Sequence, residues 1–218
     1  MMETKEKKFM GIGIGASTVK VAVLSQSGKE LEVVIEDHHG SPRDHLRKIL
    51  ERYDPSEIAG LMATGRETAS KLRIPVAFEA EAVEKGLELL NIQADAIASM
   101  GGESFVIYPL DEKGRILDYV SGNKCAAGTV EFYKQQLMRM NLNIDEANKI
   151  AHKGSVVPLA KRCSVHCKSD CTHALNKRKC NVEDIVMTLC HNMAEKVAGL
   201  LKNAGITGGR LVIIGGAS

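Results

Sequence analysis

The sequence contains no tryptophan, and aromatic residues make up only 4% of its 218 positions. Proteins that bind single-stranded nucleic acids stack bases on aromatic side chains, so this scarcity disfavours such a surface. The formal net charge is +2 and no basic face stands out, which argues against nucleic acid in general. No apolar run reaches the ~18 residues that a membrane-spanning helix needs. The sequence therefore points away from nucleic-acid-binding and membrane-spanning proteins.

The N-terminus also lacks an apolar signal segment. Residues 1–8 are mainly charged and polar, and they lead directly into a stretch with strand character. We therefore expect a cytoplasmic protein, in which thiols stay reduced and clustered cysteines more often bind metal than form disulfides. A content of 44% hydrophobic and 26% charged residues is ordinary for a globular protein, and the length suits one large domain or two small ones.

Cysteine is missing from the first 124 residues and then becomes frequent. Five of the six cysteines lie between Cys125 and Cys180, which makes metal or redox chemistry the first hypothesis. Cys125 lies in the sequence Asn-Lys-Cys-Ala-Ala-Gly-Thr over residues 123–129, and Cys163 lies in Arg-Cys-Ser-Val over residues 162–165. Paired Cys-x2-Cys knuckles are absent, which disfavours a zinc finger.

Three of these cysteines are spaced four residues apart. Cys163, Cys167 and Cys171 would share one face if a single helix holds them. For Cys167 and Cys171 the favoured interpretation is that they are small buried residues that pack this helix. The alternative is a zinc site built from these cysteines, or from His166 and His173.

The other cysteines and polar residues indicate no clear site. Cys180 and Cys190 are expected to be structural, with Cys190 on the buried face of the last helix. His38 and His39 lie at a strand end, where a solvated turn is the favoured interpretation. Arg66 follows a Thr-Gly turn. This position is equally compatible with a side chain that faces a nucleotide cleft and with one that lies on the surface.

The first half of the chain has the order of an actin-like, or ribonuclease H-like, half-domain, assigned to residues 1–92. Apolar patterning predicts three strands, a helix after the Ser-Pro start signal, a strand and two helices. The predicted elements are the strands Phe9–Gly15, Val19–Leu24, Leu31–Asp37 and Ile58–Ala63, and the helices Asp44–Tyr53, Thr68–Leu72 and Glu79–Leu90.

The turn between the first two strands is rich in glycine. Such a turn can hold a phosphate, because glycine permits close approach and Ser17, Thr18 and Lys20 add donors. It is not a Walker loop, since the Gly-x4-Gly-Lys-Ser/Thr spacing is missing and a strand follows. The alternative is a tight hairpin turn without a ligand.

The second half, assigned to residues 93–218, repeats the strand–glycine–strand pattern. The strand Ala94–Met100 ends at the glycine turn 101–104, and the strands Phe105–Leu110 and Arg115–Val120 flank a hairpin turn at 111–114. Two such turns, one from each half, can clamp the phosphates of a nucleotide and its metal. Helices are predicted over 125–141, 144–153, 164–176 and 181–204, the last with Asn181 as its N-cap.

The C-terminal stretch predicts one more buried strand, over residues 210–214, that runs into the glycine turn Gly215–Gly216. A parallel strand of this kind is normally followed by a helix on the sheet face. We therefore expect the fold to be incomplete at the C-terminus.

Together these motifs resemble the activator ATPases of 2-hydroxyacyl-CoA dehydratases and benzoyl-CoA reductases, in the superfamily of acetate and sugar kinases, heat-shock 70 proteins and actin. The likeness covers nearly the whole chain and looks closest to the activase modules associated with double-cubane-cluster reductases and fused activators. It implies an α/β, actin-like ATPase fold that binds ATP or ADP with Mg²⁺. It also implies a homodimer that shares one [4Fe–4S] cluster, with Cys125 and Cys163 of each subunit as ligands.

The residues are compatible with this implied cluster. Four thiolates suit a cubane, and a two-fold axis would supply the second pair that one chain lacks. Both cysteines are expected near helix N-termini, where free N–H groups and the helix dipole stabilise thiolates.

The resemblance also assigns nucleotide-binding residues, with three departures. Gly13 stands where the family usually has an aspartate that helps hold magnesium, and Glu103–Ser104 replaces a common Gln-Asp pair. The helix after the last glycine turn is missing. Glu103 is the best catalytic candidate, as a general base that orients water. The departures favour nucleotide binding over efficient hydrolysis. The positions carried over are Gly11, Gly15, Ala16, Ser17, Thr18, Lys20, Gly101, Gly102, Gly128, Gly215 and Gly216.

The resemblance therefore implies an ATP-dependent iron–sulfur activator. It would take an electron from reduced ferredoxin or flavodoxin and pass it, at low potential, to an iron–sulfur dehydratase or reductase component that acts on CoA esters. The alternative is a non-catalytic nucleotide-binding or dimerisation module, a degenerate repeat of a larger fused activator. A small-molecule kinase is disfavoured, because it would leave the Cys-Ala-Ala-Gly-Thr segment unexplained.

Overall fold

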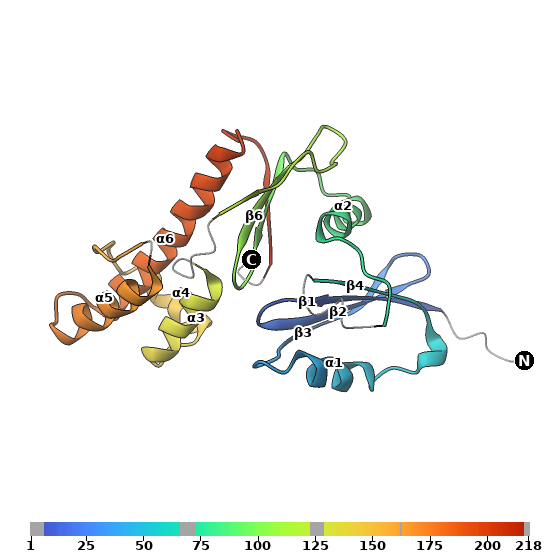
Figure 1. Ribbon diagram of the computed structural model, residues 1–218, viewed down its shortest axis with the longest axis horizontal. Helices are drawn as coiled ribbons and strands as arrows, with labels where there is room; N and C mark the ends of the chain where they lie inside the picture. Colours follow the sequence, from blue (N-terminus) through green and yellow to red (C-terminus); the bar gives the residue numbers. More distant parts are fainter. Residues whose placement is uncertain (1–6, 66–72, 123–128, 162, 216–218) are drawn as a thin grey trace, which may run out of the picture. The chain divides into compact units, whose positions relative to one another are not determined.

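The computed structural model describes residues 7–65, 73–122, 129–161 and 163–215, and the chain divides into two compact units, Met1–Gln93 and Ala94–Ser218. Each unit contains one four-stranded sheet with helices beside it (Figure 1). The strand order is β3-β2-β1-β4 in the first sheet and β7-β6-β5-β8 in the second. In both sheets the first strand pairs antiparallel with the second and parallel with the last. This repeated order places corresponding turns at corresponding positions of the two units.

The first sheet consists of β1 (Lys8–Ile14), β2 (Thr18–Ser25), β3 (Glu30–Asp37) and β4 (Ile58–Thr64). Apolar residues alternate along β1 and β2, because successive side chains of a strand point to opposite faces. The inward face packs against α1 (Pro42–Leu50), the helix that the sequence predicted over Asp44–Tyr53. The buried residues of this core are Met10, Ile12, Ile14, Val19, Val21, Val23, Leu46, Ile49 and Ala63.

The outward face of the first sheet carries Gly11 and Gly13 of β1. The register places Gly13 opposite Lys20 on β2 and Thr64 on β4, so these three residues share this face. The predicted helix α2 (Glu79–Leu90) lies on the other side of the sheet from α1 (Figure 1). The helix predicted at Thr68–Leu72 falls outside the described residues.

Apolar side chains on the outward face of the first sheet are between 42% and 60% exposed: Phe9, Leu31, Val33, Ile35 and Met62.

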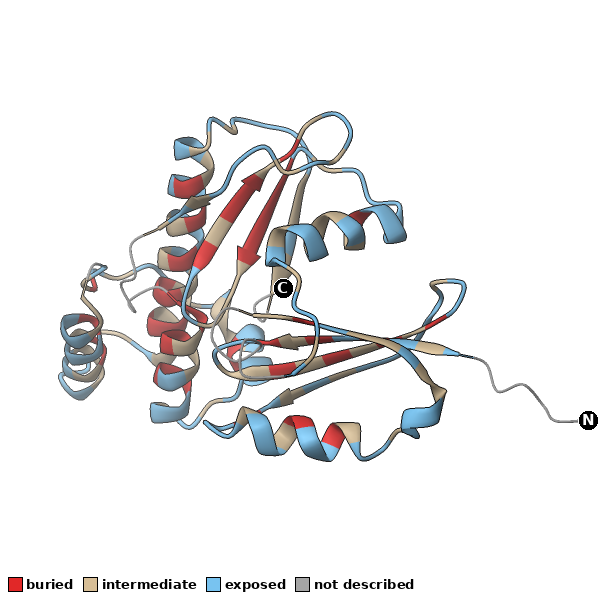
Figure 2. Ribbon diagram, turned by 45° about the vertical axis from the view of Figure 1, so that its right-hand side comes forward, coloured by how far each residue is buried: buried red, intermediate tan, exposed pale blue. Residues whose placement is uncertain are grey.

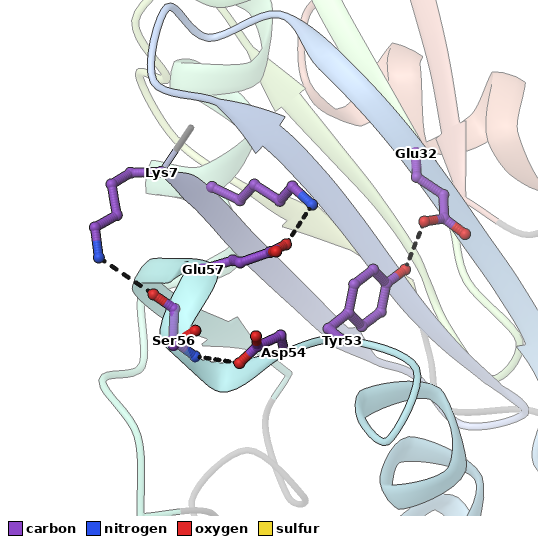
Figure 3. A network of polar contacts seen from close by, with 7 residues as sticks. Lys7, Glu32, Tyr53, Asp54, Ser56 and Glu57 are labelled. Carbon is purple, nitrogen blue, oxygen red and sulfur yellow. Dashed lines mark hydrogen bonds and ion pairs between the residues drawn. The ribbon is translucent and has the colours of Figure 1, made fainter. Parts of the chain in front are cut away.

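Polar contacts fasten the connection between α1 and β4 to the sheet (Figure 3). Lys7 Nζ donates to the backbone oxygen of Ser56 at 3.2 Å, and Ser56 N donates to Asp54 Oδ1 at 2.9 Å. Tyr53 Oη donates to Glu32 Oε2 on β3 at 2.9 Å. Burial and this hydrogen bond raise the pKa of Tyr53 to about 12, so the phenol remains a donor at physiological pH.

The second sheet consists of β5 (Ala96–Met100), β6 (Phe105–Pro109), β7 (Val120–Ser121) and β8 (Leu211–Gly215). The predicted strand Arg115–Val120 is wrong in extent. Of this stretch, Val120 pairs with β6 as part of β7, and an isolated bridge joins Ile116 to Leu110, the residue after β6. Two apolar residues of the predicted strand meet no covering layer: Leu117 is 66% exposed and Tyr119 is 61% exposed.

The described part of the second unit contains four helices: α3 (Val130–Arg139), α4 (Ile144–Ala151), α5 (Ser164–Asn176) and α6 (Val182–Asn203). Helix α6 packs against β6 and β7 of the sheet, and α3 and α4 pack against α6. All four were predicted, and Asn181 is the N-cap of α6 as expected. The inward faces of β5, β6 and α6 are buried against each other (Figure 2). The largest fully buried side chains of this core include Phe105, Ile107, Leu137, Ile185 and Val186. Within the described ranges, no helix is both long and apolar enough to cross a membrane.

Candidate functional site

The two glycine turns have the same hydrogen-bonded geometry. Gly15 N donates to Thr18 O at 2.9 Å and closes the turn between β1 and β2. In the second unit, Gly101 N donates to Ser104 O at 2.9 Å and closes the turn between β5 and β6. Each turn follows the first strand of its sheet, so the sequence correctly predicted two equivalent turns.

A glycine on the neighbouring parallel strand lies against each turn. Gly65 follows β4 with φ +120°, and a Cβ there would lie 2.4 Å from the backbone oxygen of Ile14. Gly215 ends β8 with φ +112°, and a Cβ there would lie 2.4 Å from the backbone oxygen of Met100. Both positions therefore require glycine. Gly215 was among the predicted nucleotide residues, whereas the equivalent role of Gly65 was missed.

The two glycines of β1 that precede the first turn have space beside them on the outward face of the sheet. A Cβ added at Gly11 would meet no described atom within 4 Å. A Cβ at Gly13 would lie 3.7 Å from both Lys20 Cβ and Thr64 Oγ1, which is ordinary van der Waals contact. Position 13 therefore has room for a side chain, and glycine is not a steric necessity there.

The first turn itself presents both exposed and half-buried residues. Gly15 and Ala16 are exposed, while Ser17, Thr18 and Lys20 are half-buried. The structure thus brings the predicted first-turn residues together at one end of the sheet. Exposed backbone and hydroxyl groups next to a half-buried lysine form a set suited to an anion.

His38 is a buried residue of this site that the sequence did not reveal. The expected solvated turn is wrong for His38, which is 5% exposed, although His39 is exposed. Its Nε2 lies 3.2 Å from the backbone oxygen of Gly15, and Gly40 N donates to its Nδ1 at 3.1 Å. Strand pairing was the signal that could have located His38. The end of β3 lies opposite the start of β2, and this pairing places His38, the residue after β3, beside the turn.

The second turn contacts the first turn of α3. Glu131 N donates to Gly102 O at 3.0 Å, and Thr129 is the N-cap of α3 with Oγ1 accepting from Phe132 N at 3.3 Å. Gly101 and Gly102 are half-buried, and Glu103 is exposed at the tip. The helix start just after the Cys125 segment is therefore hydrogen-bonded to the second turn.

Cys163 is the N-cap residue of α5, as the sequence predicted. It is half-buried, it is a free thiol, and its side chain makes no capping hydrogen bond. Its Sγ therefore lies at the N-terminal end of α5 and is not used to cap that helix. Cys125, Gly128 and Gly216 lie outside the described residues, as does Arg66.

The segment that leads to Cys163, residues 154–161, is called the strap here. A Cβ at Gly154, the first residue of the strap, would lie 2.1 Å from Glu183 O, so only glycine fits there. Four polar contacts join the strap to α5 and α6. The strap contacts are Ser155 N to Asp184 Oδ1 at 2.8 Å, Val157 N to Thr188 Oγ1 at 2.9 Å, Ala160 N to Asp170 Oδ2 at 2.9 Å, and Lys161 Nζ to Glu195 Oε2 at 2.5 Å.

The other cysteines pack the second core. Cys167 and Cys171 are 2% and 5% exposed on α5, which confirms them as small buried residues. Their mutual hydrogen bond and burial raise the pKa of the Cys171 thiol, so Cys171 is not a thiolate at neutral pH. Cys190 faces the core as expected and donates to Tyr133 Oη at 3.5 Å. Within the described ranges, no group of three or more His, Cys, Asp or Glu side chains is arranged to hold a metal.

Comparison with known proteins gives consistent matches along the chain. The model of the BadF/BadG/BcrA/BcrD ATPase family matches residues 10–218. The 2-hydroxyisocaproyl-CoA dehydratase activator of Clostridioides difficile is 24% identical, over 96% of this chain and 80% of the relative. The activator of lactoyl-CoA dehydratase of Anaerotignum propionicum is 26% identical, over 90% of this chain and 78% of the relative.

A solved structure shows the same fold. The activator of the 2-hydroxyisocaproyl-CoA dehydratase from Clostridium difficile, with bound ADPNP, matches with a TM-score of 0.85 at 21% identity. The match covers 96% of this chain and 80% of that chain. The actin-like ATPase fold predicted from the sequence is confirmed.

Proposed function

The chain belongs to the BadF/BadG/BcrA/BcrD ATPase family, and from this premise we propose that it is an ATP-dependent activator that passes a low-potential electron to an iron–sulfur dehydratase or reductase component acting on CoA esters. The observation that carries the proposal is the position of Cys163, a free thiol at the start of α5 that the strap holds in place. The names of the relatives, activators of CoA-ester dehydratases, support this kind of partner.

We assign nucleotide binding to the two glycine turns. Exposed backbone of the first turn, with Lys20 beside it, would take part of the phosphate charge, and Gly101 and Gly102 would line the second turn. The relative with bound ADPNP supports a nucleotide in this fold. In this proposal the half-domains 1–92 and 93–218 each supply one turn, with Gly215 and Gly216 toward the adenosine.

The donor chemistry of the two predicted ligand cysteines fits an iron–sulfur cluster. Cys163 offers a free, half-buried thiol at the start of α5, and a homodimer would provide Cys125 and Cys163 twice. A [4Fe–4S] cluster held by these thiolates supplies one-electron chemistry when bound. The hydrogen bond between Glu131 N and Gly102 O offers a direct link between the second turn and the helix after Cys125.

Hydrolysis should depend on Glu103 if this carboxylate orients the attacking water. We expect Glu103→Gln to lower the rate of ATP hydrolysis about 10²–10⁴-fold while nucleotide affinity stays near that of the wild type, because general-base catalysis contributes in this range. The measurement is phosphate release on the iron-loaded protein, with ADPNP binding measured in parallel. Glu112→Gln, at an exposed hairpin tip of the same unit, is the matched control and should change neither quantity.

The non-catalytic module remains the second candidate, favoured by Gly13. Because a Cβ at position 13 meets only ordinary contacts, Gly13→Asp can place the carboxylate that the family usually has there. We expect this variant to raise ATP hydrolysis at least about tenfold in the presence of Mg²⁺, since a carboxylate helps fix the metal that stabilises charge on the phosphates.

Gly13→Asn is the control for the Gly13→Asp experiment, because it has similar size and lacks the charge. A rise with aspartate and none with asparagine supports a catalytic site that lacks one metal-binding group. An undetectable rate in the wild type and in Gly13→Asp would instead favour the non-catalytic module.

A further inference from the structure

His38 contacts the first turn through both its backbone and its side chain. Asp37, the last residue of β3, pairs with Thr18, so the chain leaves the sheet directly beside the turn. His38 N donates to Ser17 O at 2.9 Å, and the imidazole is 5% exposed. The two contacts fix His38 against the turn from the interior side.

The hydrogen bonds of the ring determine its tautomer. Gly40 N–H can only donate, so Nδ1, at 3.1 Å, must accept and carries no hydrogen. The neutral ring then has its hydrogen on Nε2, which donates to Gly15 O at 3.2 Å. His38 therefore acts on the turn as a hydrogen-bond donor to one specific carbonyl.

This donor sets the direction of the Gly15–Ala16 peptide. In a trans peptide the C=O and the following N–H point in opposite directions across the same plane. Holding the Gly15 carbonyl toward the buried imidazole turns Ala16 N–H away from it, on the side where Ala16 is exposed. A peptide next to glycine rotates at low cost, so an external hydrogen bond is an effective way to fix it.

We propose that His38 is a positioning residue that orients the Gly15–Ala16 peptide so that Ala16 N–H donates to a phosphate oxygen of the bound nucleotide. The inference rests on the nucleotide binding proposed above. His38 does not touch the nucleotide itself, and its effect comes from selecting one of two peptide orientations before the ligand binds. Without it, the flipped orientation would aim the Gly15 carbonyl at the phosphate.

The test is ADPNP affinity with Mg²⁺, measured by calorimetry on the full chain. His38→Ala is expected to weaken binding about tenfold or more, the typical loss for one hydrogen bond to a charged group. His38→Gln can place its amide N–H where Nε2 donates, so it should restore affinity to within about threefold of the wild type. His38→Asn can replace only the Nδ1 acceptor, so it should bind as weakly as His38→Ala.

Two controls separate positioning from stability. Ile49→Val, at a fully buried core position of α1, should lower the unfolding temperature and leave the affinity unchanged. His39→Asn replaces the neighbouring exposed histidine at φ +46° with a residue that tolerates this conformation, and it should also bind normally.

The outcomes separate the inference from the function. A wild-type protein that binds no ADPNP overturns both. Wild-type affinity in His38→Ala or in His38→Asn overturns the role of His38 alone. Equal weakening in the glutamine and asparagine variants also overturns it, because it would show that the donor to Gly15 is not what matters.

Discussion

Replacing Cys163 with serine is expected to abolish iron–sulfur loading, and Cys125→Ser should do the same. Anaerobic reconstitution of the wild type with iron and sulfide should give about four irons per dimer, the content of one [4Fe–4S] cluster with four thiolate ligands. Each substitution removes two of those four ligands, because every change occurs twice in a homodimer. Iron, sulfide and the dimer fraction are the quantities to measure.

Cys180→Ser is the matched control for the iron experiment. Cys180 is a half-buried free thiol of the same unit at which we propose no ligand, so its removal should leave about four irons per dimer. A cluster that survives both Cys125→Ser and Cys163→Ser would refute the proposed ligands. A folded wild type that takes up no cluster would leave the non-catalytic nucleotide-binding module as the better description.

Alanine at Gly65 or Gly215 is expected to have the second largest effect. Each Cβ would lie 2.4 Å from a backbone oxygen of the adjacent strand, at a φ of +120° or +112° that side chains rarely adopt. Backbone strain of this kind costs about 1–3 kcal/mol, and relief of the clash requires the two parallel strands to separate. We expect each variant to lose more than about 3 kcal/mol of unfolding free energy, with nucleotide binding lost in any folded fraction.

Denaturant unfolding and ADPNP binding test the glycine prediction. Gly199→Ala is the control, because it lies within α6 and its Cβ would meet no described atom within 4 Å. Alanine in a helix is favoured over glycine by about 0.5–1 kcal/mol, so this control should be neutral or stabilised. Wild-type stability in Gly65→Ala would show that the strand and the turn are less tightly fixed than the structure indicates.

Most elements could be predicted because their signals are local. The helix 164–176 and the first strand, predicted at Phe9–Gly15 and observed at Lys8–Ile14, follow from apolar periodicity and from turn residues within a few positions. The strand predicted at Arg115–Val120 was wrong in extent. Apolar alternation shows only which residues of a segment are apolar, whereas a strand also needs a neighbouring strand to pair with along its whole length. Leu117 and Tyr119 alternate correctly and remain exposed.

The site was predictable where a residue type and its position in the chain were sufficient. Cys163 was recognised as a residue at a helix start, and Gly101 and Gly102 as a turn. His38 was missed because its role comes from the pairing of β3 with β2, which brings it to Gly15 across 23 residues of sequence. The strap was missed for the same reason, since Val157 reaches Thr188 across 31 residues.

The strap also bears on the thermodynamics of the proposed metal uptake. Ordering one residue costs about 1–2 kcal/mol in backbone entropy, and in small zinc domains that cost falls on metal binding itself. Here the hydrogen bond between Ala160 N and Asp170 joins the strap to α5, so residues 154–161 are ordered by folding alone. Iron would meet a preorganised thiol, and loss of metal should leave the second unit folded rather than unravel it.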